Sequence, residues 1–114
     1  MALALNNYET ITAVVGVNTV GIYTAPTGYD SIVLLAQCTN IGTDTQTITF
    51  AHERTVSGIA VTTEILKDFP LPANDSANLV SGKLVLETGD SLVISSSSNT
   101  DVKFISSVLE TLNQ

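Results

Sequence analysis

Residues 82–95, with the sequence G-K-L-V-L-E-T-G-D-S-L-V-I-S, are the stretch that decides the fold. Two short apolar runs, residues 84–86 and 92–94, flank a polar segment that contains Gly89 and Asp90. Leu, Val and Ile suit a pleated, half-buried surface, and glycine beside aspartate permits a tight turn. The stretch therefore predicts a β-hairpin. Gly89 and Asp90 would form its structural turn, with a positive φ at Gly89 and buried side chains at Leu84, Leu86, Leu92 and Ile94.

The rest of the composition also favours strands. The 114 residues include 16 Thr and 11 Ser, and the β-branched Thr side chain loses χ1 freedom in a helix. The length fits one domain with a single core. We expect a short leader over residues 1–8, where Asn6-Asn7 suggests a turn, followed by one β domain over residues 9–114.

Turn signals recur about every 8 to 12 residues between short apolar runs, the spacing of an all-β sandwich. We expect an all-β, single-domain antiparallel β-sandwich, jelly-roll-like, with about eight strands; a small closed barrel is the alternative. Residues 53–58 are polar and are expected to form a loop. The continuous apolar run at residues 32–36 indicates a strand that is covered on both faces or lies at an oligomer interface. The expected strands cover residues 9–17, 19–24, 31–40, 47–52, 62–69, 84–86, 92–94 and 101–109.

The charge balance argues against several partners. Eleven acids against four bases give a net charge of -7, and Arg54, Lys67, Lys83 and Lys103 are scattered, so we expect no nucleic-acid surface. No apolar run approaches the roughly 18 residues of a membrane span, and the N-terminus lacks the basic region of a signal peptide. We therefore expect no membrane partner and synthesis in a cytoplasm without export by a signal peptide.

Catalytic and metal-binding sets are missing from the sequence. His52 is the single histidine, so a cupin-like metal site cannot be assembled, and no nucleophile has a second histidine as its base. The loop residues Asp44, Asp75, Asp90 and Asp101 lack the dense spacing of a calcium loop and are explained by turn chemistry. Cys38 stands alone and is expected to be a small buried residue. We expect no enzyme, no metal and no cofactor.

One loop is a candidate contact site. Tyr29 follows the turn residue Gly28 and precedes Asp30, and an exposed aromatic beside a carboxylate is the kind of platform that binds a glycan. Tyr29 and Asp30 are therefore the residues predicted to meet a glycan or a protein partner.

Three turn motifs carry a resemblance to a known group. They are the segment Tyr-Thr-Ala-Pro-Thr-Gly at residues 23–28, the segment Pro-Leu-Pro at residues 70–72 with Asp75 after it, and Leu-Glu-Thr-Gly-Asp-Ser-Leu at residues 86–92. In this order, across roughly residues 20–110, the chain resembles small β-sandwich structural proteins of tailed bacteriophage virions. It departs from them at Tyr29-Asp30, where a basic residue often follows the glycine.

The resemblance implies a location in the virion and a structural function. It favours a capsid decoration or cement protein that binds by shape complementarity as a homo-oligomer, with a trimer expected. Its partners would then be other copies of itself and the major capsid or tail proteins. A tail or fibre component is the first alternative, and a lectin-like module that binds a host surface is the second.

Overall fold

The computed structural model describes residues 5–113, and all of their regular secondary structure is β-strand. The nine strands are β1 (Asn6–Val15), β2 (Val20–Thr24), β3 (Tyr29–Asn40), β4 (Gln46–Val56), β5 (Ile59–Leu71), β6 (Ser76–Asn78), β7 (Leu84–Leu86), β8 (Ser91–Ser96) and β9 (Val102–Leu112). The predicted all-β class and the low helix content are thus confirmed.

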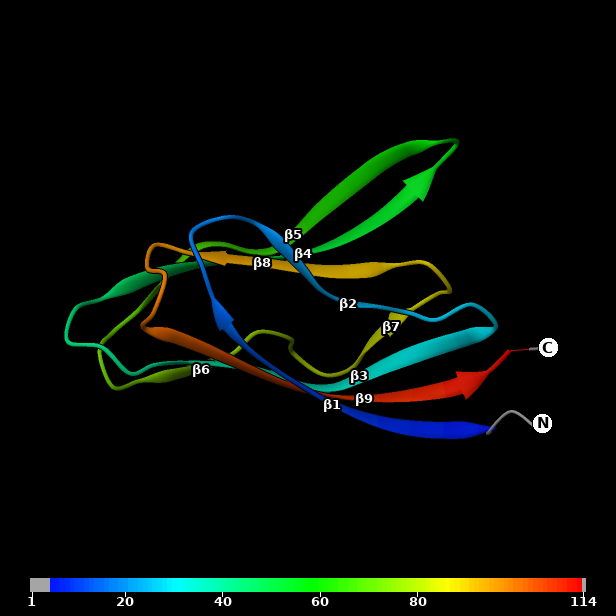
Figure 1. The fold of residues 1–114 in the computed structure, drawn as a ribbon, viewed down its shortest axis with the longest axis horizontal. Helices are drawn as coiled ribbons and strands as arrows, with labels where there is room; N and C mark the ends of the chain where they lie inside the picture. The colour runs from blue at the N-terminus through cyan, green and yellow to red at the C-terminus, as the bar shows by residue number, and fades with distance from the viewer. Residues whose placement is uncertain (1–4, 114) are drawn as a thin grey trace.

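The strands form two antiparallel sheets packed face to face (Figure 1). Sheet A has the order β1-β9-β3-β6, with β7 also paired to β3, and sheet B has the order β2-β8-β4-β5. Both β6 and β7 pair with β3, at residues 37–39 and 31–33, so they act as one interrupted strand. Counted in this way, each sheet has four strands, and every connection except the β4–β5 hairpin crosses from one sheet to the other, as in a jelly roll. The predicted β-sandwich is confirmed.

The core lies between the sheets. Phe50 of sheet B and Phe104 of sheet A meet with ring centroids 6.1 Å apart, and Cys38 is fully buried beside them in the same core cluster. The other large apolar side chains that are almost completely buried are branched aliphatic residues from both sheets: Val15, Val33, Ile48, Leu71, Leu86, Leu92, Ile94, Val102 and Val108. Their alternation along each strand is what the period of two requires.

The apolar run in β3 is an alternating strand with an irregularity. Val33 and Ala36 are buried, whereas Leu34 and Leu35 between them are 39% and 38% exposed. The pairing with β9 shifts register between Val33 and Leu35, so one additional residue interrupts the alternation. In the single chain β3 is therefore covered on its inner face only, which leaves the outer face available to another molecule.

The stretch that was expected to be a hairpin is a crossing between the sheets, so that prediction is wrong. β7 pairs with β3 in sheet A, whereas β8 pairs with β2 and β4 in sheet B. Leu86, Leu92 and Ile94 are buried as predicted, but they enter the core from opposite sheets, and Leu84 is only partly buried. A hairpin and a crossing between sheets both require alternating apolar residues on either side of the turn, so the sequence pattern could not distinguish them.

Two predicted boundaries also move. β1 begins at Asn6, which pairs with Thr111, so the expected leader boundary at residues 8 and 9 falls inside a strand; residues 1–4 lie outside the described part. The expected loop at residues 53–58 is wrong, because β4 runs to Val56 and turns at Ser57-Gly58 into β5. Glu53, Arg54 and Thr55 are polar in succession, which favours a loop in the sequence, although in β4 their side chains alternate between the two faces of the strand.

The far part of this β4–β5 hairpin projects beyond the sandwich (Figure 1). The pairing of β4 with β8 ends at Glu53 and Ser91, so within the described chain the only paired neighbour of residues 54–56 is β5. We call residues 54–63 the arm. Ser57 and Gly58 have φ values of 52° and 79°, as a tight two-residue hairpin turn requires.

Candidate interaction sites

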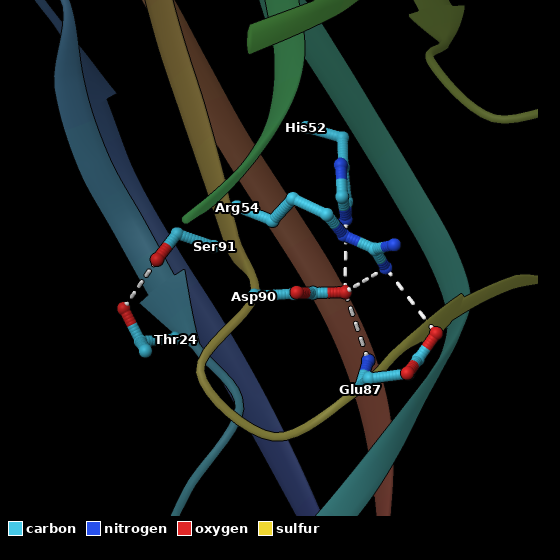
Figure 2. Close-up of polar contacts among 6 residues, drawn as sticks. All are labelled: Thr24, His52, Arg54, Glu87, Asp90 and Ser91. Atoms are coloured by element: carbon cyan, nitrogen blue, oxygen red, sulfur yellow. Dashed lines mark hydrogen bonds and ion pairs between the residues drawn. The ribbon is translucent and has the colours of Figure 1, made fainter. Parts of the chain in front are cut away.

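The turn between β7 and β8 is held by a polar cluster around Asp90 (Figure 2). One carboxylate oxygen, Oδ2, lies 2.6 Å from Arg54 Nη2, 3.1 Å from His52 Nε2 and 3.0 Å from the backbone nitrogen of Glu87. Arg54 Nη2 also lies 3.3 Å from Glu87 Oε2. His52 and Arg54 are two residues apart on β4, so both side chains leave the strand on one face and reach the turn.

The pKa of Asp90 reflects this environment. Burial of the carboxyl group opposes ionisation, but hydrogen bonds from Arg54, His52 and the Glu87 backbone outweigh it and hold the pKa below the ordinary value. The same carboxylate raises the pKa of the Arg54 guanidinium. Both groups are therefore charged at neutral pH, and the pair ties sheet B to the turn that leads out of sheet A.

The contacts in this cluster give His52 and Asp90 a structural role that requires no catalytic function. His52 lies beside an ionised carboxylate that already accepts from two other donors, and Glu53 projects to the opposite face of β4. Sequence reasoning treated Asp90 as a turn residue and did not find Arg54. The available signal was the spacing of His52 and Arg54, two of the few basic side chains, on one strand face.

A groove of about 370 Å³ opens beside this cluster. His52 and Arg54 lie at its polar end, and Val61, Thr63 and Ile65 of β5 form one wall, with Leu84 and Val85 of β7 opposite. The groove thus joins the base of the arm to the edge of sheet A.

The predicted contact residues Tyr29 and Asp30 begin β3 and are partly buried. The carbonyl of Tyr29 accepts a hydrogen bond of 2.6 Å from the Thr88 hydroxyl, and Asp30 Oδ1 accepts one of 3.1 Å from Asn113 Nδ2. Gly28 has a φ of 85°, and its carbonyl accepts a bond of 2.9 Å from the Asn113 backbone. These groups fasten the end of β9 and the turn before β8 to the start of β3. A glycan that bound here would compete for groups that already make hydrogen bonds within the chain.

A second buried polar group lies between the sheets. The Tyr23 hydroxyl of β2 donates to the Glu110 carboxylate of β9 and lies 2.8 Å from Ser31 Oγ. Asn7 Nδ2 donates to the other Glu110 oxygen at 3.0 Å. Burial and the hydrogen bond to Glu110 raise the pKa of Tyr23. These side chains supply hydrogen-bond partners to one another, and we assign them a structural role.

The outer face of sheet A carries at least one apolar side chain in each of four successive rows. Residues opposite one another in the register share a face, so Tyr8, Leu109, Ile32 and Val85 form one row across four strands. Tyr8 is 75% exposed and Val85 57% exposed. The next rows towards the far end contain Thr10, Ser107 and Leu35, then Thr12, Ile105, Gln37 and Asn78, and finally Val14, Lys103, Thr39 and Ser76.

This face differs from the rest of the molecule in charge. Its four rows contain one charged residue, Lys103, and no carboxylate, although the chain has 11 acids. A groove of about 580 Å³ lies at its β1 side, lined by Thr12, Val14, Lys103 and Ile105 among others. Asp30 lies on the same face only in the end row, opposite Thr111. An exposed area of apolar and uncharged polar side chains without acids, in an acidic chain, is typical of a surface that another molecule covers.

Within residues 5–113, no three His, Cys, Asp or Glu side chains gather as a metal site would need. No helix in that part of the chain has the length and hydropathy to cross a membrane.

Comparisons with known proteins relate the fold to assemblies. The sequence matches no family model and no curated protein. Among solved structures, a chain of infectious bursal disease virus, Gx strain, has a TM-score of 0.58 and 17% identity; the match covers 95% of this chain and 32% of the viral one. This chain therefore spans about a third of that protein.

Two similar structures match along most of their length. A chain from the acid-stable capsid of the Helicobacter pylori bacteriophage KHP30 has a TM-score of 0.57 and 12% identity, over 97% of this chain and 90% of that one. A chain from Bacillus endospore appendages, described as disulfide-linked pili, has a TM-score of 0.53 and 15% identity, over 100% and 97%. At these identities the likeness establishes the fold, which this chain shares with proteins of virus particles and of a pilus.

Proposed function

We propose that this chain is a structural component of a virus particle, a capsid decoration or cement protein of a tailed bacteriophage that binds as a homo-oligomer. The observation that carries the proposal is the outer face of sheet A, whose four rows from Tyr8 to Val14 hold seven apolar side chains and no carboxylate, with Asp30 one row further at the end of the face. The fold match over nearly the whole chain to a protein of a phage capsid supports the choice of particle.

The mechanism is binding by shape and by removal of apolar surface from water. Burial of exposed apolar side chains contributes roughly 25 cal/mol per Å² of area. The rows around Tyr8, Ile32, Val85 and Leu109 offer a flat surface for this purpose, with the Thr and Ser residues of the neighbouring rows as hydrogen-bonding groups. The acids elsewhere keep the free chain soluble until it meets its lattice.

The test is mass spectrometry of particles purified from the culture whose genome encodes the chain. The proposal expects the chain in the particle in a fixed ratio to the major capsid protein. A double variant, Tyr8→Glu with Ile105→Glu, places two carboxylates on the outer face and should remove the chain from the particle. Glu53→Gln on β4, away from sheet A, serves as a control and should leave incorporation unchanged. Purified particles without the chain would contradict the proposal.

A tail or fibre component is the alternative within the same class. Labelling of intact particles with an antibody against the chain separates the two, because head decoration labels the whole capsid surface whereas a tail protein labels one vertex. The expected homotrimer fits either place, and the symmetry of the bound chain in an image of the particle decides it.

A lectin-like module is the alternative outside this class, and Tyr29 with Asp30 is the place where it would bind. A glycan array probed with the native chain and with Tyr29→Ala tests it: loss of a specific glycan signal in the variant would favour a lectin. Because Asp30 already accepts a hydrogen bond from Asn113, we rank this function below the structural one.

The pilus-like similarity has a specific obstacle. Cys38 is the one cysteine in the sequence, it is completely buried in β3, and its burial raises the pKa of the thiol to about 12. A buried, protonated thiol does not exchange disulfides, so copies of this folded chain could not be linked as those pili are described. This favours the capsid function over a disulfide-linked fibre.

A further inference from the structure

Two of the four sheet edges of this sandwich, β6 with β7 and β2, are protected against pairing with another chain. β6 and β7 have three residues each, and β2 has five with a register shift between Gly21 and Tyr23. Short edges and bulges are the usual means of preventing edge-to-edge association. β5, with 13 residues, is the long edge strand of sheet B and needs more protection.

The half of β5 that lies on the sandwich has this protection. It contains Glu64 and Lys67, Asp68 has a φ of 49°, Pro70 lacks an N–H donor, and the pairing with β4 shifts register on either side of Phe50. Charges, bulges and proline all discourage a second chain from pairing. The half of β5 on the arm, residues 59–63 with the sequence I-A-V-T-T, contains none of them.

The backbone of this arm half is arranged for pairing. Val56 and Ile59 flank the two-residue turn, so they form a hydrogen-bonded pair, and the antiparallel alternation directs the N–H and C=O groups of Ala60 and Thr62 away from β4. No other strand of the described chain lies beyond them, since β5 is the edge of its sheet.

The side chains of the arm also lack cover. Val56, Ile59 and Val61 share one face and are 50%, 68% and 43% exposed, whereas Glu53, Thr55 and Thr62 lie on the other face. A two-stranded hairpin alone is marginally stable in water, and three or more strands with an apolar face are needed for stability. The arm therefore lacks the additional strands that would stabilise it.

We propose that residues 59–63 pair antiparallel with the same residues of a second copy, about a two-fold axis beside Val61, so that two arms form one four-stranded sheet. Ala60 and Thr62 of one copy then exchange hydrogen bonds with Thr62 and Ala60 of the other, and the two Val61 side chains meet in a non-hydrogen-bonded pair. The proposal rests on the structural function proposed above and names a two-fold contact between copies. This contact gives a dimer of the free chain and is separate from the contact that a trimer on the particle would need.

Charge favours a second copy as the occupant. Two chains of net charge -7 repel each other, so they can approach closely only through surface without acids, and residues 59–63 carry no charge. In the two-fold register Glu64 lies opposite Gly58 of the other copy, and no two carboxylates face each other. The edge strand β1 also has an uncharged run at residues 10–15, but its inward residues Ile11, Ala13 and Val15 already pack on the core, so a second strand there would bury less additional apolar surface than on the arm.

The first test is the mass of the chain in solution between roughly 1 and 100 µM, the range in which an interface of modest area associates. We expect a monomer–dimer equilibrium. Thr62→Pro removes the N–H that points away from β4 and should make the chain monomeric, whereas Thr62→Ala keeps that N–H and should leave the dimer intact. A native chain that stays monomeric, or a Thr62→Pro variant that still dimerises, overturns the proposal.

A second measurement does not depend on the proline variant folding. In Val61→Cys the two thiols would face each other across the axis, within reach of a disulfide, while the buried Cys38 does not react. We expect rapid cross-linking of Val61→Cys under mild oxidation and slow cross-linking of Val85→Cys, which places a thiol on the outer face of sheet A. Equal rates for the two variants would overturn the proposal. If the chain is present in particles but is monomeric in solution and does not cross-link, the arm contact is wrong and the proposed function stands. If the chain dimerises but is absent from particles, the proposed function is wrong and the arm contact stands.

Discussion

The turn at residues 87–90 and the turn at Ser57-Gly58 have similar local chemistry and opposite surroundings. Each contains a glycine with a positive φ, 88° at Gly89 and 79° at Gly58. Around the first turn, Ala25 exchanges backbone hydrogen bonds of 2.9 and 3.0 Å with Asp90 and Gly89, and Arg54 and His52 reach Asp90 from β4. The second turn ends an arm whose strands pair only with each other within the described chain.

Local sequence therefore specifies that the chain makes a tight turn. Contacts with residues far away in the sequence determine whether the strands on either side pair with each other or enter different sheets. Asp90 is surrounded by donors from three directions, so its turn can leave one sheet and enter the other. In the described chain no third strand pairs with the arm, so its two strands pair only with each other. Their apolar face and the outer edge of β5 are left available to a second molecule. The first region serves the stability of one chain, and we infer that the second serves association.

The largest expected effect is in the core beside the first turn. Leu86→Ala removes a fully buried side chain of β7 and should lower the free energy of unfolding by about 2 to 5 kcal/mol in denaturant titration. The neighbouring Val85→Ala, at a side chain that is 57% exposed, should change it by less than about 1 kcal/mol. If both variants lost the same unfolding free energy, the assignment of Leu86 to the core and of Val85 to the surface would be contradicted.

Removing the carboxylate of the turn should have the next largest effect. Asp90→Ala leaves the donors of His52, Arg54 and Glu87 without their acceptor and should cost about 1 to 3 kcal/mol of unfolding free energy. Asp44→Ala makes the same charge change at an exposed loop position and is the matched control. A loss no greater than that of the control would show that the cluster does not stabilise the turn.

The pH dependence of stability follows from the lowered pKa of Asp90. A carboxyl whose pKa is lower in the folded chain than in the unfolded one stabilises the fold above its ordinary pKa of 3.8, and this contribution is lost as the pH falls through the folded value. The difference in unfolding free energy between the native chain and Asp90→Asn should therefore be constant near neutral pH and shrink below about pH 4. A difference that stays constant down to about pH 2 would contradict the assignment.

The smallest effect compares the two glycines directly. Alanine at a positive φ costs about 1 kcal/mol or slightly more, and Gly89→Ala should reduce global stability by that amount. In the monomer, Gly58→Ala should reduce global stability less, because the arm can open without unfolding the sandwich. Equal global losses for the two variants would mean that the arm unfolds together with the core.

The sequence predicts the fold class because that depends on local patterns. Thr-rich alternating runs and regularly spaced turns require strands, and nine strands in a jelly-roll sandwich are what the structure contains. The positive φ of Gly89 and the burial of Leu86, Leu92, Ile94 and Cys38 also follow from local patterns and are confirmed.

Long-range partners explain what the sequence could not predict. Apolar alternation on either side of residues 87–90 is the same whether the flanking strands pair with each other or with β3 and β4, so the crossing was missed. The ion pair of Arg54 and Asp90 joins residues 36 positions apart, and single-sequence patterns contain no information on that contact. Residues 53–58 look like a loop because Glu53, Arg54 and Thr55 are polar in succession, at the base of a hairpin that pairs with no third strand of the described chain beyond Glu53.

The measurement that tests the account most directly is amide hydrogen exchange at Ala60 and Thr62 as a function of protein concentration. In the monomer these two amides point away from β4 and should exchange almost as fast as in an unstructured peptide. We predict that their exchange slows as the concentration rises through roughly 1 to 100 µM, while the amides of residues 91–96 stay equally protected throughout. Exchange at Ala60 and Thr62 that is fast and independent of concentration would contradict the claim that the arm edge joins two copies.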